Sequence, residues 1–188
     1  MKIDKMNKIQ NVSKEQWLSQ ALDTLEVSGV EAIKIGRLAK ALGTSRSGFY
    51  WHFNNRQDLL EHLLDYWVRE YTGVVTNNPD ITKLEPEMRL LAIMRAIRAQ
   101  KLAKFDLAMS LWAKIDDNVR KVVDNVVKMR LDYLRTLFAE LGFTEDELEM
   151  RVRLFLCYHS WEDAMFPDLS NQKYSNMENL RHRFFIRK

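Results

Sequence analysis

The stretch from residue 35 to residue 60 restricts the folds open to this chain more than any other: IGRLAKALGTSRSGFYWHFNNRQDLL. Its first apolar residues recur with the spacing of one helix face and are Ile35, Leu38, Ala39 and Leu42. Gly43 follows at once, where a helix commonly ends in the left-handed conformation that glycine adopts without steric cost. We therefore predict a helix that ends in a tight glycine turn.

A second, short helix is predicted from about Arg46 to His52, with the Ser45 hydroxyl placed to cap it. Several of its side chains can donate hydrogen bonds to phosphates or base edges, namely Arg46, Ser47, Tyr50 and His52. A helix, a glycine turn and a second helix indicate a helix-turn-helix, whose second helix can enter the DNA major groove. The alternative is an ordinary helical hairpin with a solvated polar face.

Five blocks in and around this motif form a pattern: Leu38-Ala39, Leu42-Gly43-Thr44-Ser45, Phe49-Tyr50-Trp51-His52-Phe53, Arg56 and Leu59-Leu60. The pattern resembles the N-terminal DNA-binding domain of the TetR family of one-component bacterial transcriptional regulators. Two positions depart from it, because Lys34 replaces the usual capping threonine and Arg56 replaces the commoner lysine. The cap at Lys34 is therefore missing or supplied otherwise, and Arg56 keeps the charge with a different hydrogen-bond geometry.

The predicted DNA contacts fall into two groups. From the residues alone, the side chains expected to face the bases are Arg46, Ser47 and Trp51. The resemblance implies phosphate contacts at matching positions of the family pattern, which are Tyr50, His52 and Arg56. Core packing is the alternative for Tyr50, whereas Phe49 and Phe53 are both expected in the core.

The positive charge of the chain is concentrated near its N-terminus. The chain has 29 lysine and arginine residues against 26 acidic residues, a net charge of +3. Residues 1–58 hold nine of the basic and six of the acidic residues, so the whole excess lies in this segment. Such a local excess favours contact with a phosphate backbone, although a solvated surface can also carry it.

Composition favours a mainly helical globular protein, because 46% of the residues are apolar and only 6 are glycine and 3 proline. We predict an all-α fold with a three-helix DNA-binding domain at residues 13–58. Residues 59–188 are predicted to form a helical domain for effector binding and dimerisation. The helix that begins near Arg56 connects the two domains, and the polar stretch from Val74 to Pro86 follows it as a break.

Capping boxes predict where two helices begin, at Ser13 for the first helix and at Thr144 for a later one. Within the later helix, residues 152–166 (VRLFLCYHSWEDAMF) are apolar or aromatic on nearly every side, which indicates burial all round. One side can pack in its own domain, but the other needs a second molecule. We therefore expect this helix and the last one, from about Ser175 to Ile186, to form a homodimer interface that suits a palindromic operator.

The second domain also carries side chains that can line an apolar pocket: Met94, Met109, Trp112, Tyr133, Phe155 and His159. The alternative for each of them is ordinary core packing. A small apolar effector bound among these helices would tilt the connecting helix. That tilt would change the spacing of the two recognition helices in a dimer.

Enzymatic and membrane functions are not favoured. The histidines, at positions 52, 62, 159 and 182, lack a metal-binding spacing, and no phosphate loop or nucleophile motif occurs, so we expect neither enzyme activity nor a cofactor or metal. No apolar run of about 18 residues is present, which argues against a membrane span. The single cysteine, Cys157, fits a reducing compartment, so we expect a cytoplasmic protein.

Together these observations predict a ligand-responsive transcriptional repressor that acts through the helix-turn-helix at about residues 35–52. Its expected partners are palindromic double-stranded operator DNA, a second copy of the chain and a small apolar effector, without a membrane. The alternative is an all-helical ligand-binding or protein-interaction module that does not bind operator DNA.

Overall fold

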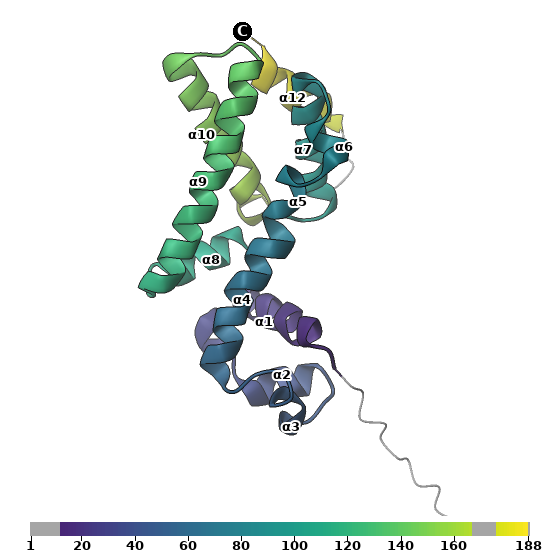
Figure 1. Cartoon of the computed structure of the whole chain (residues 1–188), viewed down its shortest axis with the longest axis vertical. Coiled ribbons are helices and arrows are strands. Elements are labelled where there is room, and N and C mark those ends of the chain that lie inside the picture. The colour runs from purple at the N-terminus through teal and green to yellow at the C-terminus, as the bar shows by residue number, and fades with distance from the viewer. Residues whose placement is uncertain (1–11, 167–175, 188) are drawn as a thin grey trace, which may run out of the picture. The chain divides into compact units, whose positions relative to one another are not determined.

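The structure is a computed structural model that describes residues 12–166 and 176–187. Within these ranges every regular element is a helix, so the predicted all-α class is confirmed (Figure 1). The chain divides into two compact units, Met1–Tyr66 (unit 1) and Trp67–Lys188 (unit 2). The division falls inside one long helix, after Tyr66, and therefore later than the predicted division after residue 58.

Unit 1 consists of helices around the predicted motif. Its elements are α1 (Lys14–Ser28), the 3₁₀ helix η1 (Val30–Ala32), α2 (Ile35–Ala41), α3 (Arg46–Phe49) and the first part of α4 (Arg56–Tyr71). The predicted capping box at the start of α1 is confirmed. The Ser13 hydroxyl accepts a hydrogen bond from the Gln16 amide, and the Gln16 side chain accepts one from the Ser13 amide. These bonds satisfy amides that a helix start otherwise leaves open.

The core of unit 1 is aromatic and holds α3 against α1. Phe49 on α3 is fully buried, and its ring meets the edge of Trp17 on α1 at a centroid distance of 5.4 Å. Phe53 is also buried and lies 5.2 Å from Phe49. The prediction that both phenylalanines belong to the core is confirmed. Because they anchor the inner side of this segment, the polar side chains between them can face solvent.

Unit 2 contains the end of α4 and these helices: α5 (Gly73–Thr76), α6 (Pro79–Thr82), α7 (Pro86–Ala99), α8 (Asp106–Ala113), α9 (Asp117–Glu140), α10 (Glu145–Met165) and α12 (Glu178–Ile186). The short helices α5 and α6 occupy the stretch that was predicted from the sequence as an irregular break. The Asn78 side chain accepts from the Asp80 amide, and Pro79 takes the first helical position. Here the polar, proline-containing residues therefore start a helix as well as separate two others.

The predicted start of a helix at Thr144 is confirmed, because Thr144 is the N-cap residue of α10 and the helix begins at Glu145. The predicted capping box itself is wrong, since the Thr144 side chain makes no capping bond. Glu145 has a φ of 50°, in the left-handed region, whereas capping requires the first residues to be regularly helical.

The core of unit 2 lies between α7, α9 and α10, and α12 adds one residue to it. Its most deeply buried members are Leu90, Ile93, Met94, Leu137, Phe138, Phe143, Val152 and Phe155, and Phe185 of α12 is also buried. The long helices α9 and α10 pack along each other, as Figure 1 shows. This packing leaves the opposite face of α10 turned away from the core.

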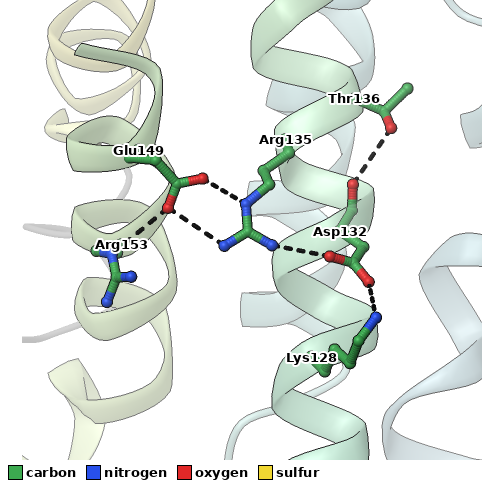
Figure 2. A network of polar contacts seen from close by, with 6 residues as sticks. All are labelled: Lys128, Asp132, Arg135, Thr136, Glu149 and Arg153. Carbon is green, nitrogen blue, oxygen red and sulfur yellow. Dashed lines mark hydrogen bonds and ion pairs between the residues drawn. The ribbon is translucent and has the colours of Figure 1, made fainter. Parts of the chain in front are cut away.

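A polar network joins the outer sides of α9 and α10 (Figure 2). Arg135 on α9 donates to the carboxylate of Glu149 on α10 and to Asp132, one turn away at 2.8 Å. Lys128 donates to Asp132 at 2.6 Å, and Arg153 lies 3.5 Å from Glu149. The bond from Arg135 lowers the pKa of Glu149, and the bond from Lys128 lowers the pKa of Asp132. All these groups are partly solvated, so the network adds little stability and mainly fixes the register of the two helices.

Large apolar side chains are exposed on α10, directly after it and on α12, and we call this set the α10/α12 face. Its members are Met150, Leu154, Trp161, Met165, Phe166, Leu180 and Phe184. Cys157 is exposed on the same helix and falls between Leu154 and Trp161 at helical spacing. The opposite side of α10 is buried and includes Val152 and Phe155. The helix is thus apolar on two sides, only one of which packs within unit 2.

Candidate nucleic-acid interface and ligand pocket

The predicted glycine turn between α2 and α3 is present. Gly43 has a φ of 65°, the left-handed conformation expected at the end of α2. The amide of Thr44 donates to the carbonyl of Ala39 at 2.9 Å, and the Gly43 amide donates to the carbonyl of Lys40. Ala39 is buried, so its small side chain lies inside the corner between the two helices. A helix, a glycine turn and a second helix therefore occur in the predicted order.

The second helix is shorter than predicted. Regular helix α3 ends at Phe49, and residues 50–52 form turns in which the His52 amide donates to the Phe49 carbonyl. The predicted cap by Ser45 is wrong, since its side chain makes no capping bond. Its hydroxyl lies 2.7 Å from the Ser47 hydroxyl instead, and this pairing competes with the backbone amides.

Two aromatic side chains next to α3 point into solvent. Trp51 is 86% exposed and Tyr50 is 60% exposed, which excludes the core-packing alternative for Tyr50. Ser47 is also exposed. Large exposed aromatic side chains are uncommon on a surface that contacts nothing, because their burial against a partner is favourable.

The Arg46 side chain bends back over α2. A Cβ atom added at Gly36 would lie 2.7 Å from Nη2 of Arg46, so the guanidinium covers this glycine. Arg46 is nevertheless exposed, together with three basic residues of α2 and its cap, Lys34, Arg37 and Lys40. No acidic residue occurs between positions 32 and 57. This stretch of unit 1 therefore carries exposed basic groups without an acidic neighbour in the sequence.

His52 and Arg56 bind backbone groups of unit 1. His52 Nε2 lies 2.7 Å from the Val12 carbonyl oxygen. Arg56 donates from Nε to the Ile33 carbonyl and from Nη2 to the Val30 carbonyl, both at 2.7 Å. Both residues thus hold the motif to the segments that precede it, and a phosphate role for them stays a prediction. No sequence signal could have revealed these bonds, because any residue can supply a carbonyl acceptor.

Unit 2 contains a pocket of about 570 Å³, part of which is open to solvent. Its walls come from the end of α4, from α5, α7, α9 and α10, and from the turn before α8. The lining residues are Tyr71, Thr72, Val75, Thr76, Ile93, Ile97, Leu102, Ala103, Asp106, Arg130, Tyr133, Leu134, Phe155, Leu156, His159 and Ser160. Most of this wall is apolar, as in sites that bind small organic molecules.

The predicted pocket residues divide into two sets. Tyr133, Phe155 and His159 line the pocket together. The others are buried in unit 2 but do not line it, and these are Met94, Met109 and Trp112. Helical spacing identifies buried positions, but it does not show which of them border an empty space.

A buried ion pair closes one side of the pocket. Arg130 on α9 donates from Nη1 to Asp106 at 2.6 Å, and both side chains are largely buried. Nη2 of Arg130 also lies 3.4 Å from the Thr72 hydroxyl, just beyond the end of α4. The ring of Trp67 on α4 lies 6.0 Å from the guanidinium carbon. Arg130 therefore links the pocket wall to the C-terminal end of α4.

Two further polar atoms at the pocket lack hydrogen-bond partners among the described residues. They are the hydroxyl of Tyr133 and Nε2 of His159, and both atoms are buried. Burial, with a smaller contribution from the charge of Arg181, lowers the pKa of His159 to about 3. Burial also raises the pKa of Tyr133. Near neutral pH the pocket therefore offers a neutral imidazole and a neutral phenol.

The described residues contain neither a metal-binding cluster nor a membrane-spanning helix. In ranges 12–166 and 176–187, no cluster of histidine, cysteine and acidic side chains is arranged to hold a metal ion. Within those ranges, too, none of the helices combines the length and the apolar character that a membrane crossing needs. The candidate sites are therefore the exposed motif of unit 1 and the pocket of unit 2.

Sequence comparisons match the N-terminal part of the chain. Residues 18–63 match the model of the family described as bacterial regulatory proteins, tetR family. The tetracycline repressor protein class C of Escherichia coli is 38% identical over 60 residues, which are 32% of this chain and 26% of that protein. The HTH-type transcriptional regulator AcrR of Shigella flexneri is 33% identical over 51 residues, 27% of this chain and 24% of that protein. The chain thus spans about a quarter of the length of the curated relatives that it matches.

Structural comparisons extend the likeness to most of the chain. A transcriptional regulator from a Rhodococcus species has a TM-score of 0.70 at 16% identity, covering 93% of this chain and 96% of that one. The TetR family transcriptional regulator PfmR from Thermus thermophilus has a TM-score of 0.70 at 19% identity, covering 91% of this chain and 97% of that one. At this identity the likeness shows a shared fold.

Proposed function

Because this chain belongs to the TetR family of bacterial regulatory proteins, we propose that it binds operator DNA as a homodimer and that a small molecule releases it. The observation that carries the DNA-binding part is the exposure of Tyr50 and Trp51 beside a segment with basic but no acidic residues. Such a surface suits a polyanion with flat, stacked bases.

Within this proposal, the residues that read bases are Arg46, Ser47 and Trp51. Tyr50 donates to a phosphate, because its side chain is exposed beside α3 and carries a hydroxyl donor. His52 and Arg56 also approach the phosphate backbone, but their bonds to Val12, Ile33 and Val30 occupy part of their capacity. We therefore assign them a smaller share of the binding free energy than Tyr50.

The proposed dimer forms through the α10/α12 face. Seven large apolar side chains are exposed there, and large exposed apolar areas commonly mark protein–protein interfaces. A twofold pair buries the same face on both copies and presents two recognition helices to a palindromic operator. Sedimentation of the purified chain as a monomer at micromolar concentration would contradict this part of the proposal.

The proposed ligand response uses the pocket of unit 2. Tyr71 and Thr72, at the C-terminal end of α4, line this pocket, and α4 begins at Arg56, directly after the recognition segment. A ligand that shifts the end of α4 would change the position of the recognition segment, by which we mean α3 and the turns after it (residues 46–52). Ligand and operator would then weaken each other's binding by the same factor.

The experiment that tests the proposal measures DNA binding by fluorescence anisotropy. The probes are the promoter DNA beside the chain's own coding region and random DNA of equal length. We expect preference for the promoter, and loss of that preference in Arg46→Ala and Trp51→Ala. Arg153→Ala serves as the matched control, because Arg153 is an exposed arginine of the α9–α10 network. Equal affinity for both DNAs in the unchanged chain would contradict operator binding.

A further inference from the structure

We propose that the pocket of unit 2 selects an uncharged, largely apolar ligand with one hydrogen-bonding group, which binds Tyr133 and His159. This inference rests on the proposed function, since it names the class of molecule that would act at the same pocket. Three independent features of the pocket support it: its polar atoms without hydrogen-bond partners, its two charged side chains that bind each other, and its apolar walls.

The unpartnered atoms supply the hydrogen-bonding part of the site. The Tyr133 hydroxyl and His159 Nε2 are buried, border the same pocket and have no protein partner among the described residues. Buried polar atoms are nearly always hydrogen-bonded, because leaving one unpaired is costly. A ligand hydroxyl or carbonyl can accept from Tyr133, and a hydroxyl can also bond the neutral His159. Such a ligand satisfies atoms that the protein alone leaves unsatisfied.

The pairing of the two charged side chains in the pocket excludes ionic ligands. The charged side chains among the described lining residues, Asp106 and Arg130, bind each other through two oxygen–nitrogen contacts of 2.6 and 3.3 Å. A carboxylate that recruited Arg130 would leave Asp106 buried without its partner, and an ammonium group would do the reverse to Arg130. Breaking a buried pair in this way is strongly unfavourable. His159 cannot attract an anion either, because burial and Arg181 keep its ring neutral.

The remaining wall fits an apolar body. It is formed largely by aliphatic side chains, including Val75, Ile93, Ile97, Leu102, Leu134 and Leu156. Phe155 adds an aromatic surface beside His159, with the ring centroids 4.4 Å apart. The favourable free energy of binding would therefore come mainly from apolar area removed from water, and the polar pair would set the orientation.

The test is isothermal titration calorimetry of the full chain with ligands that share one hydrocarbon body and carry a neutral, an anionic or a cationic head group. The probes are octan-1-ol, octanoate and octylammonium at pH 7, and a second set of naphthol and naphthoate removes any dependence on ligand shape. We expect the neutral member of each set to bind at least about tenfold more tightly than its charged counterparts, because only the charged ones must break the Asp106–Arg130 pair.

Variants assign this binding to the pocket. Tyr133→Phe should weaken the alcohols by about three- to tenfold, the loss of one hydrogen bond. Tyr66→Phe, the same change outside the pocket, should leave the affinity unchanged. Ile97→Trp fills the pocket and should abolish binding, with circular dichroism and thermal unfolding used to verify that this variant is folded.

The outcomes separate this inference from the function on which it rests. Tighter binding of octanoate and naphthoate, unchanged binding in Ile97→Trp, or no binding of any probe would overturn the inference. Promoter DNA is titrated in parallel with each probe present. Alcohols that bind in the pocket without releasing the DNA would support the ligand class and count against the proposed release. Release of the DNA by the anions alone would support the proposed release and count against the proposed ligand class.

Discussion

The recognition segment of unit 1 and the pocket of unit 2 use polar side chains in opposite ways. In unit 1 the polar side chains are neighbours in the sequence and are mostly exposed, and the segment contains no acidic residue. In the pocket of unit 2 they come from helices far apart in the sequence and are buried or half-buried, and the charges bind each other. The first arrangement suits a charged partner that arrives from solvent, and the second suits a neutral one that leaves solvent.

This difference has consequences for stability as well as for binding. Exposed charges contribute little to folding, so they can be replaced at small cost to the fold. Buried charges make the fold depend on both partners being present. The two regions should therefore respond differently to salt, to substitution and to pH, and each response can be measured.

The largest difference between the two regions is expected in the salt dependence of their binding affinities. Raising the salt concentration from about 50 to about 200 mM should weaken operator binding by about a thousandfold, because counterions compete for the phosphates. Binding of octan-1-ol in the pocket should change by less than about twofold, since no net charge is removed from solvent. Anisotropy and calorimetry over this range provide the measurement. A steep salt dependence of alcohol binding would contradict the contrast.

Removal of one arginine from each region should have unequal effects on the fold. Arg130→Met leaves Asp106 buried and unpaired and should lower the free energy of unfolding by about 3–5 kcal/mol. The double variant Asp106→Leu/Arg130→Met should recover most of this loss, because no charge remains buried. Arg46→Met should change the same quantity by no more than about 0.5 kcal/mol. Urea denaturation measures all three, and equal stability of the two single variants would refute the contrast.

Acidification should destabilise unit 2 through His159. Its folded-state pKa of about 3 lies below its ordinary value of 6.5, so the unfolded chain takes up the proton first as the pH falls. The stabilising contribution is therefore complete above pH 6.5 and is lost progressively toward pH 3. Between about pH 7 and about pH 5 the free energy of unfolding should fall by roughly 2 kcal/mol from this group.

The comparison that isolates this effect is His159→Gln against the unchanged chain. The variant removes the titrating group, so its unfolding free energy should depend less on pH over this interval. Identical pH dependence of the two proteins in urea denaturation would show that His159 is not held neutral.

The smallest change in stability is expected on substitution in the α9–α10 network. This network lies in unit 2, but its charges are exposed like those of unit 1. Arg135 and Glu149 are 35% and 37% exposed, and Asp132 is more so. Arg135→Met should therefore leave the urea unfolding midpoint nearly unchanged, and the small shift should shrink further at high salt. A shift as large as that of Arg130→Met would show that exposure does not determine how much these ion pairs stabilise the fold.

Sequence reasoning identified the parts of unit 1 that depend on neighbouring residues. The capping box at Ser13 and the left-handed Gly43 follow from local backbone chemistry, and both are present. Phe49 and Phe53 follow from the spacing of apolar residues within one segment. The bonds of His52 and Arg56 were missed, because their acceptors are backbone carbonyls distant in the sequence.

The pocket of unit 2 was only partly predictable. Its wall combines Tyr71, Asp106, Arg130 and Ser160, which four separate segments contribute. Spacing along one helix cannot show that these segments meet, nor that Met94 packs against core atoms while Phe155 borders a cavity. The pairing of Asp106 with Arg130 likewise depends on tertiary structure alone. Local patterns therefore specify the recognition segment, whereas the packing of whole helices specifies the pocket.

Hydroxyl-radical footprinting of the promoter DNA beside the chain's own coding region tests the central claim most directly. That claim is that a symmetric pair of chains presents two recognition helices to one duplex. We predict two protected half-sites whose centres are about 10 base pairs or a multiple of one helical turn apart. Protection should disappear in Trp51→Ala. A single protected patch, or no protection at concentrations that saturate the mobility shift, would contradict the account.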